Sequence, residues 1–436
     1  MTLRRLIVLL ALVAAIVGAQ SASAANSPNM RLDYSLLDPT SGRTDSDIAF
    51  WGNIGVAGNY DGFRIFNTQT RQQLVSFLCR GPQNDVSLWE HDGRLLLFMS
   101  VDQPQINGLT VCSQVRSSDT TVTDPNGFEG IRIFDITDPT APVYLKGIRT
   151  NCGSHTNTLV PDLANNRVLI YSTTASTSGG PYCQIPHNRI PIVGVPLNAP
   201  EKASVIAEPH VIPTLRGCHD ITVFLEINKA AASCESEGQL WDITDPANPG
   251  TATPLMRIDP PGVVVNYWHS AAFTWDGQYV VFDDESFTNT CQPSGDGKIH
   301  IFRVSDGALM SSFMIPRPQT SYCSVHNGNI IPVAGRYLFV AGWYYGGTSV
   351  VDFTNPAQPQ EVAYYDFTPT SGQSWSSYWY NGRIYSNDMN RGVDVFNMLT
   401  PYLPYGQQWT HLNAQTQEDL YIPSLTALGQ LRPAKR

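Results

Sequence analysis

The stretch Gly130-Ile-Arg-Ile-Phe-Asp-Ile-Thr-Asp-Pro-Thr-Ala-Pro142 decides the predicted fold. It contains a glycine bend, a short strand with alternating side chains and a Thr-Asp-Pro turn that leads into the next strand. Two close copies run from Gly238 to Pro249 and from Gly347 to Pro359. Four fainter copies occupy residues 62–67, 190–195, 297–302 and 392–397. The copies recur every ~45–70 residues, a period typical of propeller blades rather than of helical solenoids.

These seven copies predict an all-β protein, specifically a seven-bladed β-propeller. A length of 436 residues would by itself allow two or three domains. Tandem repeats argue for one ring, because a single blade cannot bury both of its faces. The predicted organisation is a signal peptide (1–24), a lead-in segment that is a candidate for a closing strand (25–46), the seven-bladed propeller (47–398) and a C-terminal tail (399–436).

The N-terminus has the features of an export signal. Arg4 and Arg5 precede an apolar run from Leu6 to Val17, and small residues around Ala24 suit a cleavage site. No second apolar segment follows, so we expect a secreted or periplasmic protein without an integral membrane segment; Sec and twin-arginine export both remain open. The formal net charge of −10 and the lack of a basic run argue against binding of nucleic acid.

Eight cysteines fit an oxidising compartment and a disulfide framework. Eight cysteines allow 105 connectivities. Their order along the chain nevertheless favours sequential pairs, each of which would link a blade to its own loop. The predicted pairs are Cys79 with Cys112, Cys152 with Cys183, Cys218 with Cys234, and Cys291 with Cys323.

Four histidines fall at one position of the repeat, just before or at the start of a predicted innermost strand. They are His155, His219, His269 and His326. Innermost strands of a propeller surround the central channel and begin at the same mouth, so these side chains should ring the axis. Four neutral imidazoles suit a transition metal such as Fe, Cu or Zn. Asp220, Asp284 and Glu285 are the candidate carboxylates for orienting the imidazoles, and Glu285 or Asp284 is also a candidate base.

A structural explanation of the same register also exists. Repeats inherit residues by descent, and a histidine at a strand start can simply bond to a neighbouring backbone. The ring would then be a packing feature or a metal-free ligand site.

The repeat units resemble the LVIVD repeat, found in propellers of secreted and surface proteins. The order Ser154-His155, Cys218-His219-Asp220, His269 before Phe282-Asp-Asp-Glu285, and His326-Asn327 is similar to that of the choice-of-anchor B group of extracellular proteins. The resemblance spans about residues 47–398 and implies a propeller fold and an exported location, without a settled reaction. The chain has no recognisable anchor after residue 398, which is a departure from that group.

Two functions follow as hypotheses. The first is an exported metal-dependent enzyme, oxidative or hydrolytic, whose ligand the sequence leaves open between a small molecule, a glycan and a protein. The second is a non-enzymatic scaffold whose loops, residues 102–126 and 172–186, hold a protein or glycan. A purely structural ring is a third possibility.

Overall fold

The structure is a computed structural model that describes residues 25–38, 44–103, 128–174, 183–212, 217–234, 237–333, 335–367, 372–399 and 409–418. The predicted signal peptide and Cys112 lie outside these residues, as does most of the predicted loop 102–126 and part of the loop 172–186. Within the described part of the chain the protein is all-β, and its only helical turns are η2 (Leu163–Asn165), η3 (Pro200–Lys202) and η4 (Leu225–Ile227). No described helix is long and apolar enough to cross a membrane.

The described strands form six sheets, which divide into seven four-stranded antiparallel units because one nine-stranded sheet contains two of them. The first three units contain β3 (Asp45–Trp51), β4 (Ile54–Asn59), β5 (Gly62–Asn67) and β6 (Gln72–Leu78); β7 (Gln83–His91), β8 (Arg94–Val101), β9 (Gly130–Asp135) and β10 (Val143–Arg149); and β11 (Asn157–Asp162), β12 (Arg167–Ser172), β13 (Ile192–Pro196) and β14 (Ser204–Ala207). The fourth and fifth contain β15 (Ile221–Phe224), β16 (Lys229–Cys234), β17 (Glu237–Asp242) and β18 (Met256–Ile258); and β19 (Trp268–Phe273), β20 (Tyr279–Asp284), β21 (Ile299–Arg303) and β22 (Leu309–Phe313).

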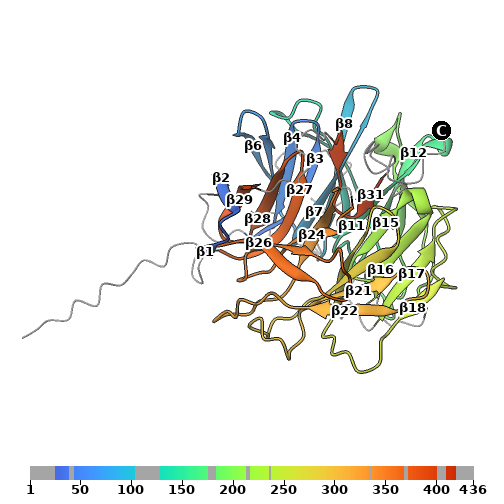
Figure 1. The fold of residues 1–436 in the computed structure, drawn as a ribbon. Coiled ribbons are helices and arrows are strands. Elements are labelled where there is room, and N and C mark those ends of the chain that lie inside the picture. The colour runs from blue at the N-terminus through green and yellow to red at the C-terminus, as the bar shows by residue number, and fades with distance from the viewer. Residues whose placement is uncertain are drawn as a thin grey trace, which may run out of the picture.

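The last two units are joined through parallel pairing of their first strands, β23 and β27. The sixth unit contains β23 (Asn327–Ile331), β24 (Leu338–Gly342), β25 (Thr348–Asp352) and β26 (Gln360–Asp366), with the short β1 (Ala25–Asn26) at its edge. The seventh contains β27 (Ser374–Tyr380), β28 (Arg383–Asp388) and β29 (Gly392–Met398). Its fourth strand is β2 (Met30–Leu37), which pairs antiparallel with β29; Figure 1 shows the blue β2 beside the red β29. The lead-in segment thus ties the start of the chain to its last unit.

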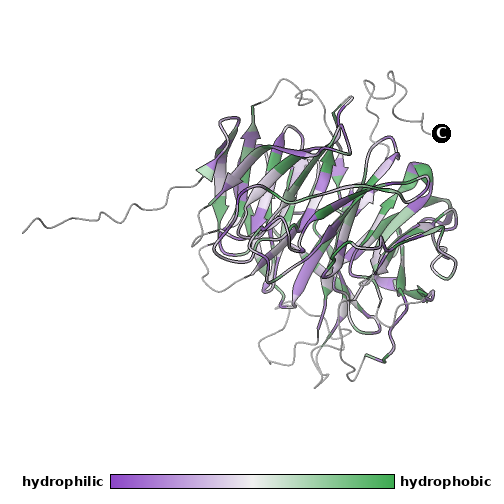
Figure 2. Cartoon of the chain, turned by 60° about the horizontal axis from the view of Figure 1, so that its bottom comes forward, coloured by the Kyte–Doolittle hydropathy of each residue, from purple (hydrophilic) through white to green (hydrophobic). Residues whose placement is uncertain are grey.

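We call β3, β7, β11, β15, β19, β23 and β27 the leading strands, because each is the first of its unit in sequence apart from the N-terminal β1 and β2. They contact one another in that order, and β27 contacts β3, so the contacts form a closed cycle. Buried apolar clusters lie between neighbouring units; one, for example, combines Val56 and Phe63 with Leu88 and Phe134. Figure 2 shows hydrophobic and hydrophilic residues alternating along many of the strands.

The repeat glycine opens the third strand of its unit where the backbone of the fourth strand is close. At Gly130 φ is 128°, and a Cβ would lie 2.2 Å from the carbonyl oxygen of Ile148. Only glycine accepts this conformation and this approach without strain. After the strand, the Asp135 carboxylate accepts a bond from the Thr137 amide at 3.0 Å, which forms the turn that the Thr-Asp-Pro signature predicts.

The C-terminal segment, residues 409–418, packs across the far ends of the leading strands. Its β30 (His411–Leu412) pairs with β3, and its β31 (Thr416–Gln417) pairs with β15. The Asn413 amide accepts a bond from the Leu88 N–H at 2.7 Å and donates one to the Leu88 carbonyl at 2.9 Å. Gln417 binds both backbone groups of Phe273 in the same way, at 2.7 and 2.8 Å. The sequence pattern of the tail was too weak to predict this contact.

Candidate metal centre

The four histidines predicted to share a register lie together in a row of contacting imidazoles. Ring centroids are 4.2 Å apart between His155 and His219, 4.1 Å between His219 and His269, and 4.1 Å between His269 and His326. All four side chains are buried. Four segments that are far apart in sequence therefore place their imidazoles side by side.

The strand pairing of each unit explains this convergence. The backbone N–H of His155 donates to the Thr173 carbonyl at 2.8 Å, and that of His219 donates to the Ser233 carbonyl at 2.7 Å. Each acceptor lies in or next to the second strand of the unit, where the leading strand begins. His326 makes the equivalent bond to Gly342, also at 2.8 Å. His269 is already inside β19, where the pairing with β20 contains an irregularity between Trp268 and Ala271.

Three of the disulfides lie beside this row. The bonds Cys152–Cys183, Cys218–Cys234 and Cys291–Cys323 match three predicted pairs, whereas the fourth prediction involves Cys112, outside the described residues. Cys152, Cys218 and Cys323 precede His155, His219 and His326 by three, one and three residues. The cysteines are therefore structural crosslinks at the histidine end of the units rather than thiolate ligands.

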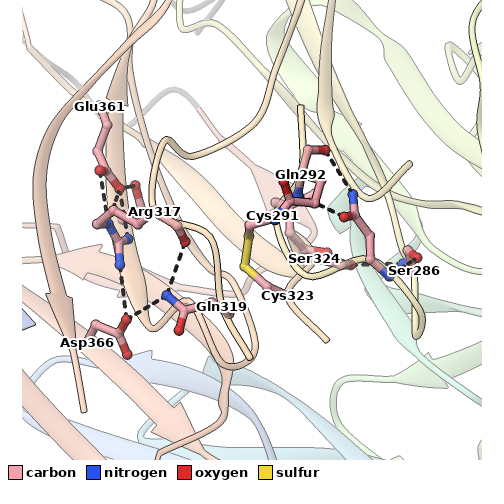
Figure 3. The surroundings of a disulfide bond; sticks show 12 residues. Ser286, Cys291, Gln292, Arg317, Gln319, Cys323, Ser324, Glu361 and Asp366 are labelled. Carbon is pink, nitrogen blue, oxygen red and sulfur yellow. Dashed lines mark hydrogen bonds and ion pairs between the residues drawn. A yellow bond between two sulfur atoms is a disulfide. The ribbon is translucent and has the colours of Figure 1, made fainter. Parts of the chain in front are cut away.

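Figure 3 shows the surroundings of one of these disulfides, Cys291–Cys323. The Ser286 N–H donates to the Ser324 hydroxyl at 2.9 Å and the Cys323 N–H donates to the Asn289 carbonyl at 2.6 Å, so hydrogen bonds as well as the disulfide join the loop after β20 to the segment leading to His326. Nearby, the Arg317 guanidinium pairs with Glu361 at 2.8 Å and with Asp366 at 3.1 Å. The segment before His326 is thus tied to the sixth unit as well as to the fifth.

The Nδ1 atom of each imidazole faces an acceptor. It lies 3.2 Å from Asp102 in His155 and 3.0 Å from Asp220 in His219. In His269 it lies 3.4 Å from Asp283, and in His326 it lies 2.7 Å from the Trp375 carbonyl oxygen. The hydrogen bonds at Nδ1 of His219 and His326 fix the tautomer of these two rings and leave Nε2 as the free lone pair, which is the usual arrangement behind metal-binding histidines. In His155 and His269 a carboxylate oxygen lies close to Nδ1 on the same side of the ring.

Glu285 lies on the opposite side of two of the rings. Its carboxylate oxygens are 3.9 Å from His269 Nε2 and 3.6 Å from His326 Nε2. It also accepts a hydrogen bond from the buried Tyr344 hydroxyl. Ligand atoms of His269, Glu285 and His326 all lie within 4.8 Å of one another, and so do those of His219, Asp220 and His269. Glu285 is therefore placed as a ligand or a base, not as a group that orients an imidazole from behind.

The three carboxylates predicted to support the imidazoles have different positions. Asp220 contacts His219 as expected, but Asp284 touches none of the four histidines. It accepts bonds from the backbone N–H groups of Asn266 and Tyr267, both at 2.8 Å, and of Gly297 at 2.7 Å. The carboxylate that faces His269 is that of Asp283, the preceding residue of β20.

Burial and neighbouring charges together set the protonation of these imidazoles. It lowers the pKa of His219 and of His326 well below the ordinary value, and the neighbouring imidazoles lower it further. Burial also acts to lower the pKa of His269, but the carboxylates of Glu285 and Asp283 outweigh it and raise that pKa to about 10. The neighbourhood of His269 therefore favours a positive charge, while His219 and His326 stay neutral and able to coordinate.

A pocket opens above the row, with a volume of about 370 Å³. The residues that line it are Tyr60, Gln83, His155, His219, Asn266, Tyr267, Glu285, Phe287, Tyr322, His326, Tyr344, Trp375 and Met389. Tyr344 and Trp375 belong to two aromatic runs of the sequence, residues 343–345 and 375–380. Comparison with protein-family models and with curated proteins finds no match to this chain.

Proposed function

We propose that the row His155, His219, His269 and His326 is a metal centre and that the protein is an exported metal-dependent enzyme. The observation that carries this proposal is the common orientation of the imidazoles, with every Nδ1 atom facing an oxygen acceptor. Imidazole ligands suit Fe, Cu or Zn, and buried carboxylates offset the charge of a divalent ion. Packing alone does not require four contacting imidazoles to be held in this way.

A metal held by these imidazoles would polarise a substrate oxygen or activate a water molecule. Glu285 supplies the acid–base chemistry in this proposal, because it is buried and lies within 4 Å of two imidazole nitrogens. Burial raises the pKa of Glu285, although His269 and the hydrogen bond from Tyr344 act against that shift. A carboxyl group with a raised pKa is suited to exchange a proton with a substrate at the floor of the pocket.

We propose further that the seven units are the blades of a seven-bladed β-propeller of the LVIVD type. The closed cycle of contacts between leading strands supports the ring, and β2 as the outer strand of the last unit suits its closure. The repeat glycine and the Thr-Asp-Pro turn support the resemblance to the LVIVD repeat. The disulfides fit an extracytoplasmic location.

The test is elemental analysis of the mature protein, purified from an exporting host without chelator. We expect near-stoichiometric Fe, Cu or Zn, and none in a His219→Ala/His269→Ala double variant. His91→Ala is the matched control, since His91 lies at the other end of β7, and it should keep the metal. Absence of metal from the wild type, even after reconstitution, would leave the binding scaffold as the better hypothesis.

A further inference from the structure

The walls of the pocket above the histidine row are aromatic. Six rings line it: Tyr60, Tyr267, Phe287, Tyr322, Tyr344 and Trp375. Trp375 lies 4.6 Å from the His326 ring and 6.3 Å from Tyr60, and Tyr267 lies 5.3 Å from His219. The volume of about 370 Å³ is at the lower end of the roughly 300–1,000 Å³ of small-molecule sites. The space suits a small, planar, apolar body.

Several of the polar groups on these walls are already engaged within the protein. The Tyr344 hydroxyl bonds to Glu285, and the Tyr322 hydroxyl accepts a bond from Gln373. Asn266 donates its amide to the Glu285 carbonyl oxygen at 2.7 Å. A sugar carries a hydroxyl on most of its carbons, and burying those hydroxyls without partners is costly. The described walls therefore disfavour a carbohydrate.

Charge narrows the ligand class further. The described lining contains no lysine or arginine, while Glu285 lies in it and Asp102 lies 3.2 Å behind His155. An anionic ligand would meet carboxylates without a cationic side chain to bind it. An organic ammonium is held best by a cage of several ring faces. Tyr322 also packs edge-to-face on Tyr344, at 5.2 Å and 76°, so these two rings form one wall rather than a cage around a point charge.

We infer that the pocket binds a neutral hydroxylated aromatic compound, a phenol of one or two rings, as the substrate of the proposed metal centre. The aromatic body lies against the Trp375 and Phe287 walls, and its hydroxyl points to the floor, where it donates a hydrogen bond to Glu285. This inference rests on the proposed function for the role of the metal, but the aromatic walls bind the ring whether or not a metal is present.

The experiment titrates 2-naphthol, 2-naphthoate and methyl glucoside into metal-free protein by calorimetry. Naphthol should bind at least tenfold more tightly than either of the other two. Phe287→Leu, at a mouth residue that is 59% exposed and so tolerant of substitution, should weaken naphthol about fivefold or more and leave thermal unfolding unchanged. Tyr279→Leu is the matched control, because Tyr279 does not line this pocket, and it should bind naphthol like the wild type.

A second arm uses Zn²⁺-loaded protein, with tetramethylammonium as an added probe. Naphthol should bind more tightly than it does without the ion, and tetramethylammonium should bind at least tenfold more weakly than naphthol. Equal or tighter binding of naphthoate, the glucoside or tetramethylammonium would overturn the assignment, as would no binding of naphthol. If Zn²⁺ fails to bind while naphthol binding still depends on Phe287, the metal proposal fails and the phenol pocket stands.

Discussion

Replacing Asp220 by asparagine should weaken metal binding without removing any of the four imidazoles. Asp220 is fully buried, and one of its oxygens lies 3.0 Å from His219 Nδ1. Its other oxygen accepts bonds from the Asn327 amide at 3.2 Å and the Gln415 amide at 3.5 Å. An asparagine has only one acceptor oxygen, so it cannot accept from both the His219 ring and the Asn327 and Gln415 amides. Its NH₂ group must then face one of these donors.

The size of the effect follows from this geometry. Loss of the carboxylate behind a metal-binding imidazole typically reduces affinity ~10–100-fold, or about 1.4–2.8 kcal/mol. We expect Asp220→Asn to fall in this range when Zn²⁺ is measured by competition with a chromophoric chelator. Thermal unfolding of the metal-free proteins separates this loss from a folding defect.

Asp284→Asn provides the matched control. Asp284 is also buried, but it bonds to backbone N–H groups rather than to an imidazole. The substitution should lower stability while leaving Zn²⁺ affinity within about twofold. Unchanged affinity in Asp220→Asn, or an equal loss in Asp284→Asn, would refute the idea that carboxylates behind the rings tune a metal site.

Three further predictions concern acid–base chemistry, pH and the C-terminal segment. Glu285→Gln should keep near-stoichiometric metal by elemental analysis, since four imidazoles remain, but lose most turnover of any phenol that the wild type converts. Burial raises the pKa of Asp388 to about 7, so the stability that its protonated form contributes is full below about pH 4 and is lost as the pH rises through 7. Asp388→Asn should remove that decline in the free energy of unfolding, which is measured by urea unfolding at pH 4 and pH 8. Since each pKa unit corresponds to about 1.4 kcal/mol, the decline in the wild type amounts to up to ~4 kcal/mol. Asn413→Ala leaves the buried N–H and C=O groups of Leu88 without their side-chain partner and should cost ~2–4 kcal/mol by urea unfolding; a loss under about 0.5 kcal/mol would show that the segment is only loosely attached.

The sequence predicted structure best where repeated motifs place equivalent residues at equivalent positions of successive strand units. The glycine and the Thr-Asp-Pro turn predicted the strand units, and the shared position of His155 and its three equivalents predicted their convergence. Asp102 could not be found in this way, because it lies at the end of β8 in another unit and approaches His155 only through packing. Which of Asp283 and Asp284 faces His269 depends on the irregular pairing of β19 with β20. The alternation of side chains along a strand does not reveal that irregularity.

The C-terminal segment was out of reach for a different reason. Its strands β30 and β31 span two residues each, too few for any periodic pattern. Side-chain amides, Asn413 and Gln417, make much of the attachment, and their partners are backbone groups of Leu88 and Phe273, far away in sequence. Likewise, the pocket walls combine rings from separate units, so the aromatic runs gave no sign of which residue faces the histidines.

The most direct measurement is anomalous diffraction from a crystal of the mature protein grown with Zn²⁺, recorded on both sides of the zinc absorption edge. We predict one strong peak in the histidine row, at about 2.0–2.1 Å from the Nε2 atoms of the residues that bind it. His219 and His269 should be among them. A crystal that binds Zn²⁺ elsewhere, with no peak between these imidazoles, would contradict the metal centre.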